Sequence, residues 1–590
     1  MRARFWTDAA FERAAFLAVV RRRIRAAIAL TLVLLFGPLF ILPEMAKTVS
    51  ARASGLPEGV SGEAQSWLRA TVASGKLPEL RWPDFSDYSK HPQKFYELNG
   101  YSSWWTKDNE PTPQARQLIA LFQQADQKGL SPDDYDGPRW SDRLAALKPV
   151  QDRPAEADFV KLELALSVCA MRYISDLHIG KVNPKRLAFA IDDESKKYDL
   201  AEFLKDRVVA ASDVAGVLAE VEPQYPGYRR TVQALQRYIE LAKQDDGELL
   251  PPVKKAINPG DPYPGVPRLA RLLRLVGDLP ADASIRADQV KYEGDLVSAV
   301  TNFQRRLGRE PSGRIVTQTV ADLNIPLSQR VRQMQLTLER WRWLPSAYQA
   351  APIVVNIPEF RLRAYDRDFN IGSTMKVVVG KALEHNTPVF SDTMEYVVFR
   401  PYWQVPRSII RAELIPRIAR DPDYLAKKEY EVVDSDQNVV ADGTVSSDVL
   451  DQLRAGKLSI RQKPGPKNAL GLVKFIFPNS YNVYMHDTPS TELFAKSRRD
   501  FSHGCIRLER PADLAAWVLR DNPGWNAERI RAAMNGSMTQ QVNLAHPIPV
   551  LILYGTVIVL EDGVVQFYDD IYGHDAALAK VLAKGYPYPW

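Results

Sequence analysis

The chain has 590 residues, of which 45% are hydrophobic and 25% charged, a composition typical of a folded globular protein. At roughly 150 residues per domain it has room for about three or four domains. Its formal net charge of +6 is small for this length, and its one dense basic cluster lies near the N-terminus, so nucleic acid is a poor candidate partner. Cys169 and Cys505 are the two cysteines and allow one disulfide at most, which excludes a disulfide-based scaffold.

The N-terminal segment combines arginines with an apolar run. Arg21–Arg23 and Arg25 precede the run, which extends from Ala26 to Leu42. Arginines on this side of a hydrophobic segment keep that end in the cytoplasm and direct the rest across the membrane. We predict a cytoplasmic basic leader and an uncleaved membrane anchor over residues 1–45, with a cleaved signal peptide as the alternative. Both predictions place the remaining chain outside the cytoplasm.

Two segments follow that differ in composition. Residues 46–94 are rich in Pro, Gly and Ser, which predicts a linker that contains one short helical piece near Glu63–Ala73. Residues 95–248 carry apolar side chains at helical spacing and are predicted to form a helical domain. Cys169 lies in an apolar helical stretch of this domain, where a cysteine usually behaves as a small buried hydrophobic residue.

A second proline- and glycine-rich linker leads to a compact helical unit at residues 265–328. Its helix Ala299–Gln304, the turn at Gly313 and the segment Thr319–Leu323 resemble a three-helix peptidoglycan-binding module. The resemblance implies affinity for glycan strands. The alternative is a helical bundle that binds no ligand.

From residue 350 onward the apolar pattern changes from helical to alternating. Nine short β-rich runs bounded by Gly, Pro, Asn or Asp predict a mainly β domain over residues 350–573. Residues 401–466 interrupt this pattern with a helical piece, and an insertion of this length predicts a partly helical lid. The predicted fold class is therefore a multidomain α+β protein.

The chemistry concentrates in two short motifs of the predicted β domain. Tyr484-Met485-His486-Asp487 is followed by Ser502-His503-Gly504-Cys505-Ile506-Arg507-Leu508. A thiol becomes a strong nucleophile beside a base, and histidine is the base that works near neutral pH. Zinc held by both histidines and the cysteine is a weaker interpretation, because no second pair of metal-type ligands lies nearby. We predict neither a metal nor a cofactor.

This arrangement is similar to the signature of the L,D-transpeptidases. In both, a histidine is followed after a spacer by Ser/Thr-His-Gly-Cys-x-Arg/Asn, here with sixteen residues between His486 and His503. Asn468–Gly471 and His486–Pro489 look like the large branch of that family, which carries a helical scaffold, a peptidoglycan-binding module and an inserted capping segment. The resemblance covers most of the chain.

The resemblance implies a role for each residue of the motif. Cys505 would be the nucleophile, and His486 would accept its proton and later protonate the leaving amine. Because Asp487 should point to the other side of the strand, a backbone carbonyl or a Ser/Thr is expected to orient the imidazole. The backbone N–H groups of Gly504 and Cys505 are candidate oxyanion donors, and His503 is expected to support the site.

Four further residues are candidates for substrate binding: Arg507, Tyr484, Trp403 and Asn468. Arg507 alternates with Cys505 along the chain and could hold a substrate carboxylate in a bidentate pair. A salt bridge that fixes the loop is the alternative for Arg507. Tyr484 could equally line a cleft or pack internally.

The function implied by the resemblance is formation of 3→3 cross-links in peptidoglycan through a cysteine thioester, with release of D-Ala. The alternatives are an L,D-carboxypeptidase, an enzyme that attaches a protein to peptidoglycan, and a non-catalytic wall-binding anchor. The implied partners are donor and acceptor stem peptides, the membrane at the N-terminus and other cell-wall synthases. The expected location is the periplasmic side of the inner membrane, with a role in wall biogenesis and cell shape.

Overall fold

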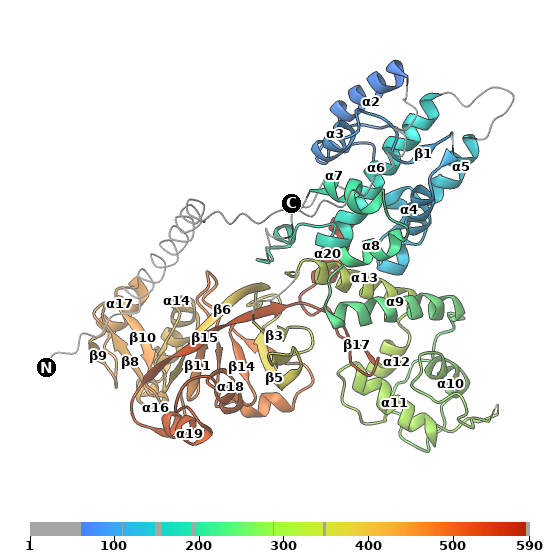
Figure 1. Ribbon diagram of the computed structural model, residues 1–590. Coiled ribbons are helices and arrows are strands. Elements are labelled where there is room, and N and C mark those ends of the chain that lie inside the picture. Colours follow the sequence, from blue (N-terminus) through green and yellow to red (C-terminus); the bar gives the residue numbers. More distant parts are fainter. Residues whose placement is uncertain are drawn as a thin grey trace, which may run out of the picture. The chain divides into compact units, whose positions relative to one another are not determined.

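The computed structural model describes residues 61–108, 110–147, 156–191, 196, 199–286, 288–345 and 350–585 (Figure 1). The predicted leader and anchor at residues 1–45 lie outside these ranges. Within them, no helix combines the length and the apolar character needed to cross a bilayer. The chain folds as two compact units, of which the first contains Asp392–Leu493 and Cys505–Ile548 and the second contains residues 61–391 and 549–585 together with Phe494–Gly504.

The first unit carries the strands that lead to the chemical motifs. These strands are β6 (Phe390–Phe399), β11 (Val473–Ile476), β12 (Met485–His486) and β14 (Ile506–Leu508). β11 is antiparallel to both β6 and β12, and β12 is parallel to β14. Helices α18 (Pro511–Val518) and α19 (Ala527–Asn535) follow, and the alternating pattern did not predict them.

The predicted insertion is a small α/β body with its own core. Its elements are β7 (Trp403–Gln404), α14 (Arg407–Ile409), the π-helix η7 (Ile410–Leu414), α15 (Ile415–Arg420), α16 (Tyr424–Lys428), β8 (Tyr430–Val433), β9 (Val439–Ala441), α17 (Ser447–Ala455) and β10 (Ser459–Gln462). The strands form a sheet in the order β7-β10-β8-β9. Ile410, Leu425 and Ile460 are among the buried side chains between its helices and sheet. We call residues 401–466 the capping segment.

In the second unit, five strand segments of the mainly β region pair with one another. They are β3 (Ile353–Asn356), β4 (Arg361–Tyr365), β5 (Ile371–Gly380), β13 (Asp500–Ser502) and the end of β15 (Gln540–Leu553). β3 is parallel to β15 and antiparallel to β4, and β5 is antiparallel to β4 and parallel to β13. β13 therefore ends directly before His503, Gly504 and Cys505.

The helical N-terminal region is built around α6 (Glu156–Ile179). Its other elements are α2 (Gly62–Ser74), α3 (Lys90–Glu97), the short hairpin β1 (Thr106–Lys107) and β2 (Glu110–Pro111), α4 (Pro113–Gln123), α5 (Trp140–Ala146), α7 (Leu200–Phe203), α8 (Val214–Val221) and α9 (Pro226–Gln244). α6 is buried on most of its circumference, and its buried side chains include the charged residues Glu163, Arg172 and Asp176 as well as apolar ones. Cys169 on α6 is buried, and its burial raises the pKa of the thiol well above the usual range, so the prediction of a buried hydrophobic role is confirmed.

Part of the segment predicted as a linker is folded. Residues 62–74 form α2, and Leu68 and Val72 pack in the same hydrophobic core as α6. Ser61 caps α2 through its side chain, which accepts a hydrogen bond from the N–H of Ala64, and Gly75 ends the helix in the left-handed conformation. Ser61 and Gly75, two of the Ser and Gly residues that suggested a linker, are therefore helix ends.

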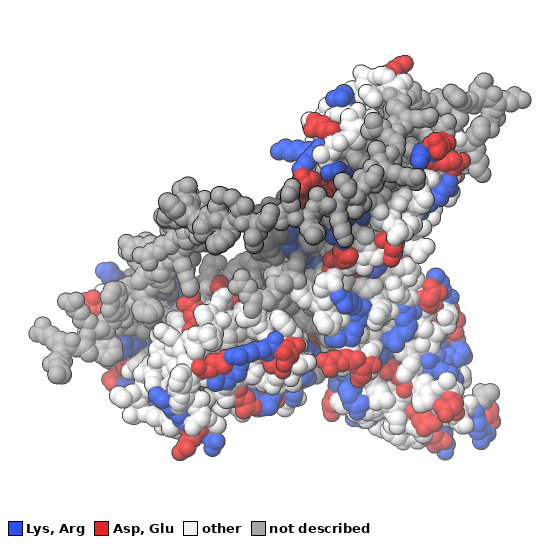
Figure 2. Space-filling view, viewed as in Figure 1, with Lys and Arg blue, Asp and Glu red and all other residues white. Residues whose placement is uncertain are grey.

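Lys and Arg side chains are intermixed with Asp and Glu on the face shown in Figure 2. Many charged side chains of the described residues pair locally, for example Arg207 with Glu220 and Arg417 with Glu413. The charge on this face is therefore neutralised over short distances and does not form an extended field of one sign.

The peptidoglycan-binding-like module shares its core with elements from outside the module. Its helices are α10 (Val266–Leu275), α11 (Asp295–Arg306) and α12 (Thr317–Leu323). The same hydrophobic cluster includes residues of α9, of α13 (Leu327–Arg342) and of the hairpin β16 (Val557–Val559) and β17 (Val565–Phe567). The hairpin lies within the predicted β domain, 350–573, yet it packs with the module. The last helix of the described chain, α20 (His574–Leu582), follows the hairpin.

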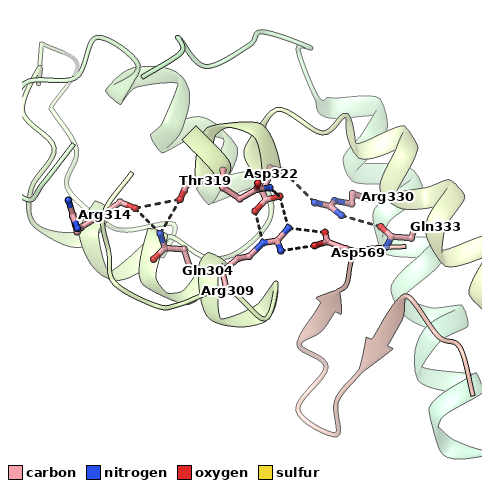
Figure 3. Close-up of polar contacts among 9 residues, drawn as sticks. Gln304, Arg309, Arg314, Thr319, Asp322, Arg330, Gln333 and Asp569 are labelled. Carbon is pink, nitrogen blue, oxygen red and sulfur yellow. Dashed lines mark hydrogen bonds and ion pairs between the residues drawn. The ribbon is translucent and has the colours of Figure 1, made fainter. Parts of the chain in front are cut away.

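Arg309 joins the module to the segment that follows the hairpin (Figure 3). Its guanidinium donates to Asp322 of α12 at 2.9 and 3.1 Å and to Asp569 at 2.7 and 2.8 Å. Nearby, Gln333 of α13 donates to the carbonyl oxygen of Tyr568 at 2.8 Å. The contacts of Arg309 hold the module against the C-terminal segment by charge-assisted hydrogen bonds, and Gln333 adds a neutral hydrogen bond from α13.

Replacing Arg309 tests this junction. Arg309→Ala removes four charge-assisted hydrogen bonds and leaves the buried Asp322 with less compensation, so we expect a loss of about 1.5–3 kcal/mol in unfolding free energy. Arg286→Ala is the matched control, because Arg286 makes a bidentate pair with Asp288 in which both side chains are more than 70% exposed. An exposed pair contributes less than about 1 kcal/mol. Equal shifts in the thermal unfolding of the two variants would contradict a stabilising role for the Arg309 junction.

Candidate active site

The parallel pairing of β12 with β14 places the cysteine beside the histidine motif. Met485 lies opposite Ile506, and the N–H of Ile506 donates to the carbonyl of Tyr484 at 3.0 Å. Cys505 directly precedes Ile506 and is therefore level with Tyr484 on the neighbouring strand. Tyr484 and His486 are two residues apart and share a face, with ring centroids separated by 5.8 Å.

His486 is buried and its imidazole is held by the backbone. Nδ1 lies 2.5 Å from the carbonyl oxygen of Asp487. Because a carbonyl can only accept, Nδ1 carries the proton and Nε2 carries the lone pair. Burial, and next the positive charge of Arg507, lower the pKa of His486 to about 3, so the ring is neutral near pH 7. The prediction that a backbone carbonyl orients this ring is confirmed.

The carboxylate of Asp487 points away from the imidazole. Oδ2 accepts from the N–H of Leu472 at 2.8 Å, and Oδ1 accepts from the N–H of Thr488 at 2.7 Å. Gly471 is left-handed, with φ 61°, and a Cβ there would lie 2.3 Å from Oδ2 of Asp487. Asp487 therefore fixes the loop before β11 and leaves the orientation of the ring to the backbone.

Cys505 keeps part of its surface exposed, while the protein packed around it still raises the pKa of the thiol. Its Sγ lies 3.8 Å from the carbonyl oxygen of Asn482. Hydrogen bonds from Tyr484 and the charges of Arg507 and Lys474 oppose the effect of burial. A protonated thiol beside a neutral imidazole follows, so activation requires proton transfer at the moment of attack.

Tyr484 lies between the thiol and the capping segment. Burial raises the pKa of Tyr484 well above its usual value, and so does its contact with Cys505, while a hydrogen bond with Trp403 opposes them. Trp403 belongs to β7, the first strand of the capping segment. Lys474 Nζ lies 5.8 Å from the centroid of the Tyr484 ring and adds a cation on that side. The structure thus brings Trp403 and Tyr484 together at Cys505.

Arg507 presents a buried donor that has no hydrogen-bond partner among the described residues. Its Nε is buried and unsatisfied, and burial lowers the pKa of the guanidinium. The charge of Arg507 acts on both Cys505 and His486. A buried cationic donor of this kind suits an anionic group of a ligand, since leaving it unpaired is costly.

Asn468 is placed differently from the prediction. Its side chain is fully buried, and Nδ2 donates to the carbonyls of Pro401, Gln462 and Lys463 at 2.9–3.3 Å. Oδ1 accepts from the N–H of Leu470 at 2.8 Å. With every polar atom engaged by the backbone, Asn468 ties together the two ends of the capping segment. This placement differs from the expected contact with a substrate, and the binding role of Asn468 stays a prediction.

The backbone at Gly504 requires glycine. Its φ of 115° is a conformation that side chains disfavour. Its N–H donates to Ser502 Oγ at 3.1 Å, which differs from the expected role of this N–H as an oxyanion donor. Its carbonyl accepts from Thr387 Oγ1 at 2.7 Å. Sequence reasoning assigned no role in the site to Thr387, which lies far from the two motifs along the chain, and it noted Lys474 only as part of the family resemblance.

His503 is exposed, and its ring packs against that of His385 with centroids 4.8 Å apart. Its supporting role stays a prediction. Among the described residues, no cluster of three or more His, Cys, Asp or Glu side chains is arranged to hold a metal ion.

Comparison with known proteins assigns families to two regions. Residues 351–547 match the family model of an L,D-transpeptidase catalytic domain, and residues 90–235 match that of a scaffold domain. A Haemophilus influenzae protein provisionally named an L,D-transpeptidase is 31% identical to this chain over 263 residues, which are 44% of this chain and 52% of that protein. The match thus spans about half of the relative's length.

The resemblance found in the sequence is confirmed for these regions, which are similar to an L,D-transpeptidase catalytic domain and to a scaffold domain. The fold class is confirmed in the same terms, since the C-terminal region is mainly β and the N-terminal region helical. The predicted boundary of the helical domain, 95–248, differs from the match by 5 residues at its start and 13 at its end.

The low pKa of His486 predicts acid sensitivity of the fold. In the unfolded chain the imidazole binds a proton below its ordinary value of 6.5, whereas in the folded protein it stays neutral down to about 3. Stability from this residue is therefore present above pH 6.5 and falls as the pH drops from 6.5 to 3, by at most about 1.4 kcal/mol per pH unit. His486→Gln should lose less stability across this window than the wild type.

The matched control is His546→Gln, because His546 is exposed on β15. Denaturant unfolding at several pH values should give parallel curves for this control and the wild type, and a shallower pH dependence for His486→Gln. Identical pH dependence in all three proteins would contradict a buried neutral His486.

Proposed function

We propose that this protein is a peptidoglycan L,D-transpeptidase that forms 3→3 cross-links between stem peptides. The observation that carries the proposal is the neutral His486, with Nε2 as its acceptor, on the strand next to Cys505. The catalytic-domain match over residues 351–547 supports the reaction class. The nucleophile, the base and the substrate groups are assigned here from the residues of the site.

In the first half-reaction Cys505 Sγ attacks the carbonyl that joins the third stem residue to the terminal D-Ala. The thiol proton passes to Nε2 of His486 as the C–S bond forms. The C–N bond to D-Ala then breaks, and the imidazolium returns the proton to the leaving amine. The tripeptide remains attached to Cys505 as a thioester.

In the second half-reaction an amine of a neighbouring stem peptide attacks the thioester. Nε2 of His486 accepts the proton of the amine, the C–S bond breaks, and the sulfur recovers its proton. The product is a peptide bond between the third residues of two stems. Water in place of the amine would make the protein an L,D-carboxypeptidase, and a protein lysine would make it an enzyme of protein attachment.

Arg507 and the capping segment supply binding functions in this proposal. The unsatisfied Nε of Arg507 recognises a carboxylate of the donor stem, which fits its buried cationic donor. Trp403 and Tyr484 form the wall of the donor site nearest to the thiol. The capping segment, which has its own core, covers this site as a lid.

The remaining regions place the enzyme at its polymeric substrate. The apolar N-terminal run anchors the chain in the inner membrane and exposes the other domains to the periplasm. The module at 265–328 binds glycan strands, and other cell-wall synthases are the class of partner that would supply uncross-linked stems. A non-catalytic wall-binding anchor would need only the module. The experiment below distinguishes this function from catalysis.

Muropeptide analysis tests the proposal. Purified full-length protein is incubated with peptidoglycan rich in tetrapeptide stems, and the digested products are separated and weighed. We expect 3→3 cross-linked dimers and free D-Ala with the wild type, none with Cys505→Ala, and at least about 100-fold less with His486→Gln, because a missing general base costs about 10²–10⁴ in rate.

Cys169→Ala is the matched control, since Cys169 is a buried thiol of the helical region and should leave the dimers unchanged. Tripeptides without dimers would support the carboxypeptidase instead. No change in either product with any variant would contradict a catalytic role and favour the anchor.

A further inference from the structure

Thr387 holds the carbonyl group that directly precedes the cysteine. Its side chain is 1% exposed, and Oγ1 donates to the carbonyl oxygen of Gly504 at 2.7 Å while accepting from the N–H of Gly380 at 2.8 Å. The hydroxyl therefore donates its one proton to the carbonyl oxygen of Gly504, and the N–H of Gly380 fixes the position of the hydroxyl oxygen from the other side.

The backbone of Thr387 is fixed as well. Its N–H lies 3.3 Å from the hydroxyl oxygen of Tyr572, and that hydroxyl donates to the carbonyl of Gly380 at 2.5 Å. Two residues after Thr387, the carbonyl of Val389 accepts from the N–H of Ala190 at 3.0 Å. Ala190 belongs to the helical N-terminal region and Tyr572 to the C-terminal segment. The segment around Thr387 is therefore held by contacts with both regions.

Holding the Gly504 carbonyl also fixes the N–H of Cys505. The two groups belong to one planar peptide unit, and in a trans peptide the C=O and N–H bonds point in opposite directions. The described residues contain no cis peptide. The N–H of Cys505 is therefore directed away from Thr387. Without this anchor the unit would rotate easily, because Gly504 restricts its own dihedral angles little.

The direction of this N–H bears on catalysis because the attacked carbonyl becomes negatively charged. Preorganised donors aimed at the developing oxyanion are often the largest single contribution to the rate of acyl transfer. The N–H of Gly504 is directed to Ser502. The N–H of Cys505 is thus the amide of the motif whose direction Thr387 controls.

We propose that Thr387 is a positioning residue that sets the oxyanion hole by locking the Gly504–Cys505 peptide, an inference that rests on the proposed acyl-transfer function. Thr387 acts through this peptide and contacts no reacting atom. Tyr572 and Gly380 hold Thr387 in place, which gives the C-terminal segment a part in the arrangement of the site.

Two thiol reactions separate this role from a general effect on the cysteine. Acylation by a carbapenem passes through a tetrahedral oxyanion and needs the donor. Alkylation by iodoacetamide is a displacement at a saturated carbon, forms no oxyanion and reports only the reactivity and access of the thiol. Both rates are measured by intact mass on full-length protein, with Cys505→Ala to identify the reacting thiol.

Thr387→Val keeps the shape of the side chain and removes the hydroxyl. We expect its acylation rate to fall at least about tenfold, by analogy with the 10²–10³ loss for a missing oxyanion donor, and its alkylation rate to stay within about twofold of the wild type. Thr387→Ser retains the hydroxyl and should recover most of the acylation rate. Thr231→Val is the matched control, because Thr231 is also 1% exposed and its Oγ1 donates to the carbonyl of Gly227 at 2.7 Å within α9.

The outcomes separate the inference from the proposed function. An unchanged acylation rate in Thr387→Val, or an equal fall in both rates, would overturn the positioning role while leaving the proposed function intact. Acylation lost equally in Thr231→Val would also overturn it, since the effect would then follow from any buried hydroxyl. A wild type that is alkylated at Cys505 but never acylated would contradict the proposed function and the inference together.

Discussion

The hydrogen bond from Nδ1 of His486 to the carbonyl of Asp487 is the contact on which the chemistry of this site depends. It assigns the proton to Nδ1 and the lone pair to Nε2, and it does so with a backbone group that carries no full charge. A carboxylate in the same place would favour the imidazolium. Here the ring is buried and neutral, and its basicity becomes available only when a proton must be moved from the thiol.

In the proposed mechanism, the charges around Cys505 and His486 act on the thiolate and the transition state. Arg507 and Lys474 both lower the pKa of Cys505 and of His486, so they favour the deprotonated form of each group. Burial counteracts them at the sulfur, and the resting thiol stays protonated. In the proposed reaction the same two cations would also act on the negative charge that develops during attack. In this proposal the resting thiol and imidazole are both neutral, and the two cations stabilise the negative charge that forms during the reaction.

The motifs predicted that the histidine and the cysteine lie on neighbouring segments, and the alternating apolar runs predicted the mainly β region around them. Cysteine, histidine and glycine at this spacing have few other uses, and β-branched runs alternate only where one face is buried. The orientation of the imidazole was also predictable, because Asp487 had to point to the opposite side of its strand. Motif spacing and the local alternation of side chains were enough to predict these three features.

The features that the sequence did not reveal depend on long-range contacts. Asn468 looked like a binding residue because of its place near the motif, but its amide is consumed by three carbonyls at the ends of the capping segment. Thr387 lies more than one hundred residues before Gly504, and nothing in its own neighbourhood marks it. The hairpin β16–β17 reads as part of the β domain, yet its apolar face packs with the helical module. Such partners are chosen by tertiary packing, which local propensity does not encode.

Nitrogen NMR of the histidine side chains tests the central claim most directly. In full-length protein labelled with ¹⁵N-histidine, with His486→Gln used to assign the signals, the account predicts a neutral His486 at pH 7. Its Nδ1 should be protonated, its Nε2 should be unprotonated, and neither signal should titrate as the pH is lowered to 5. A proton on Nε2, or an imidazolium paired with a Cys505 thiolate at pH 7, would contradict the account.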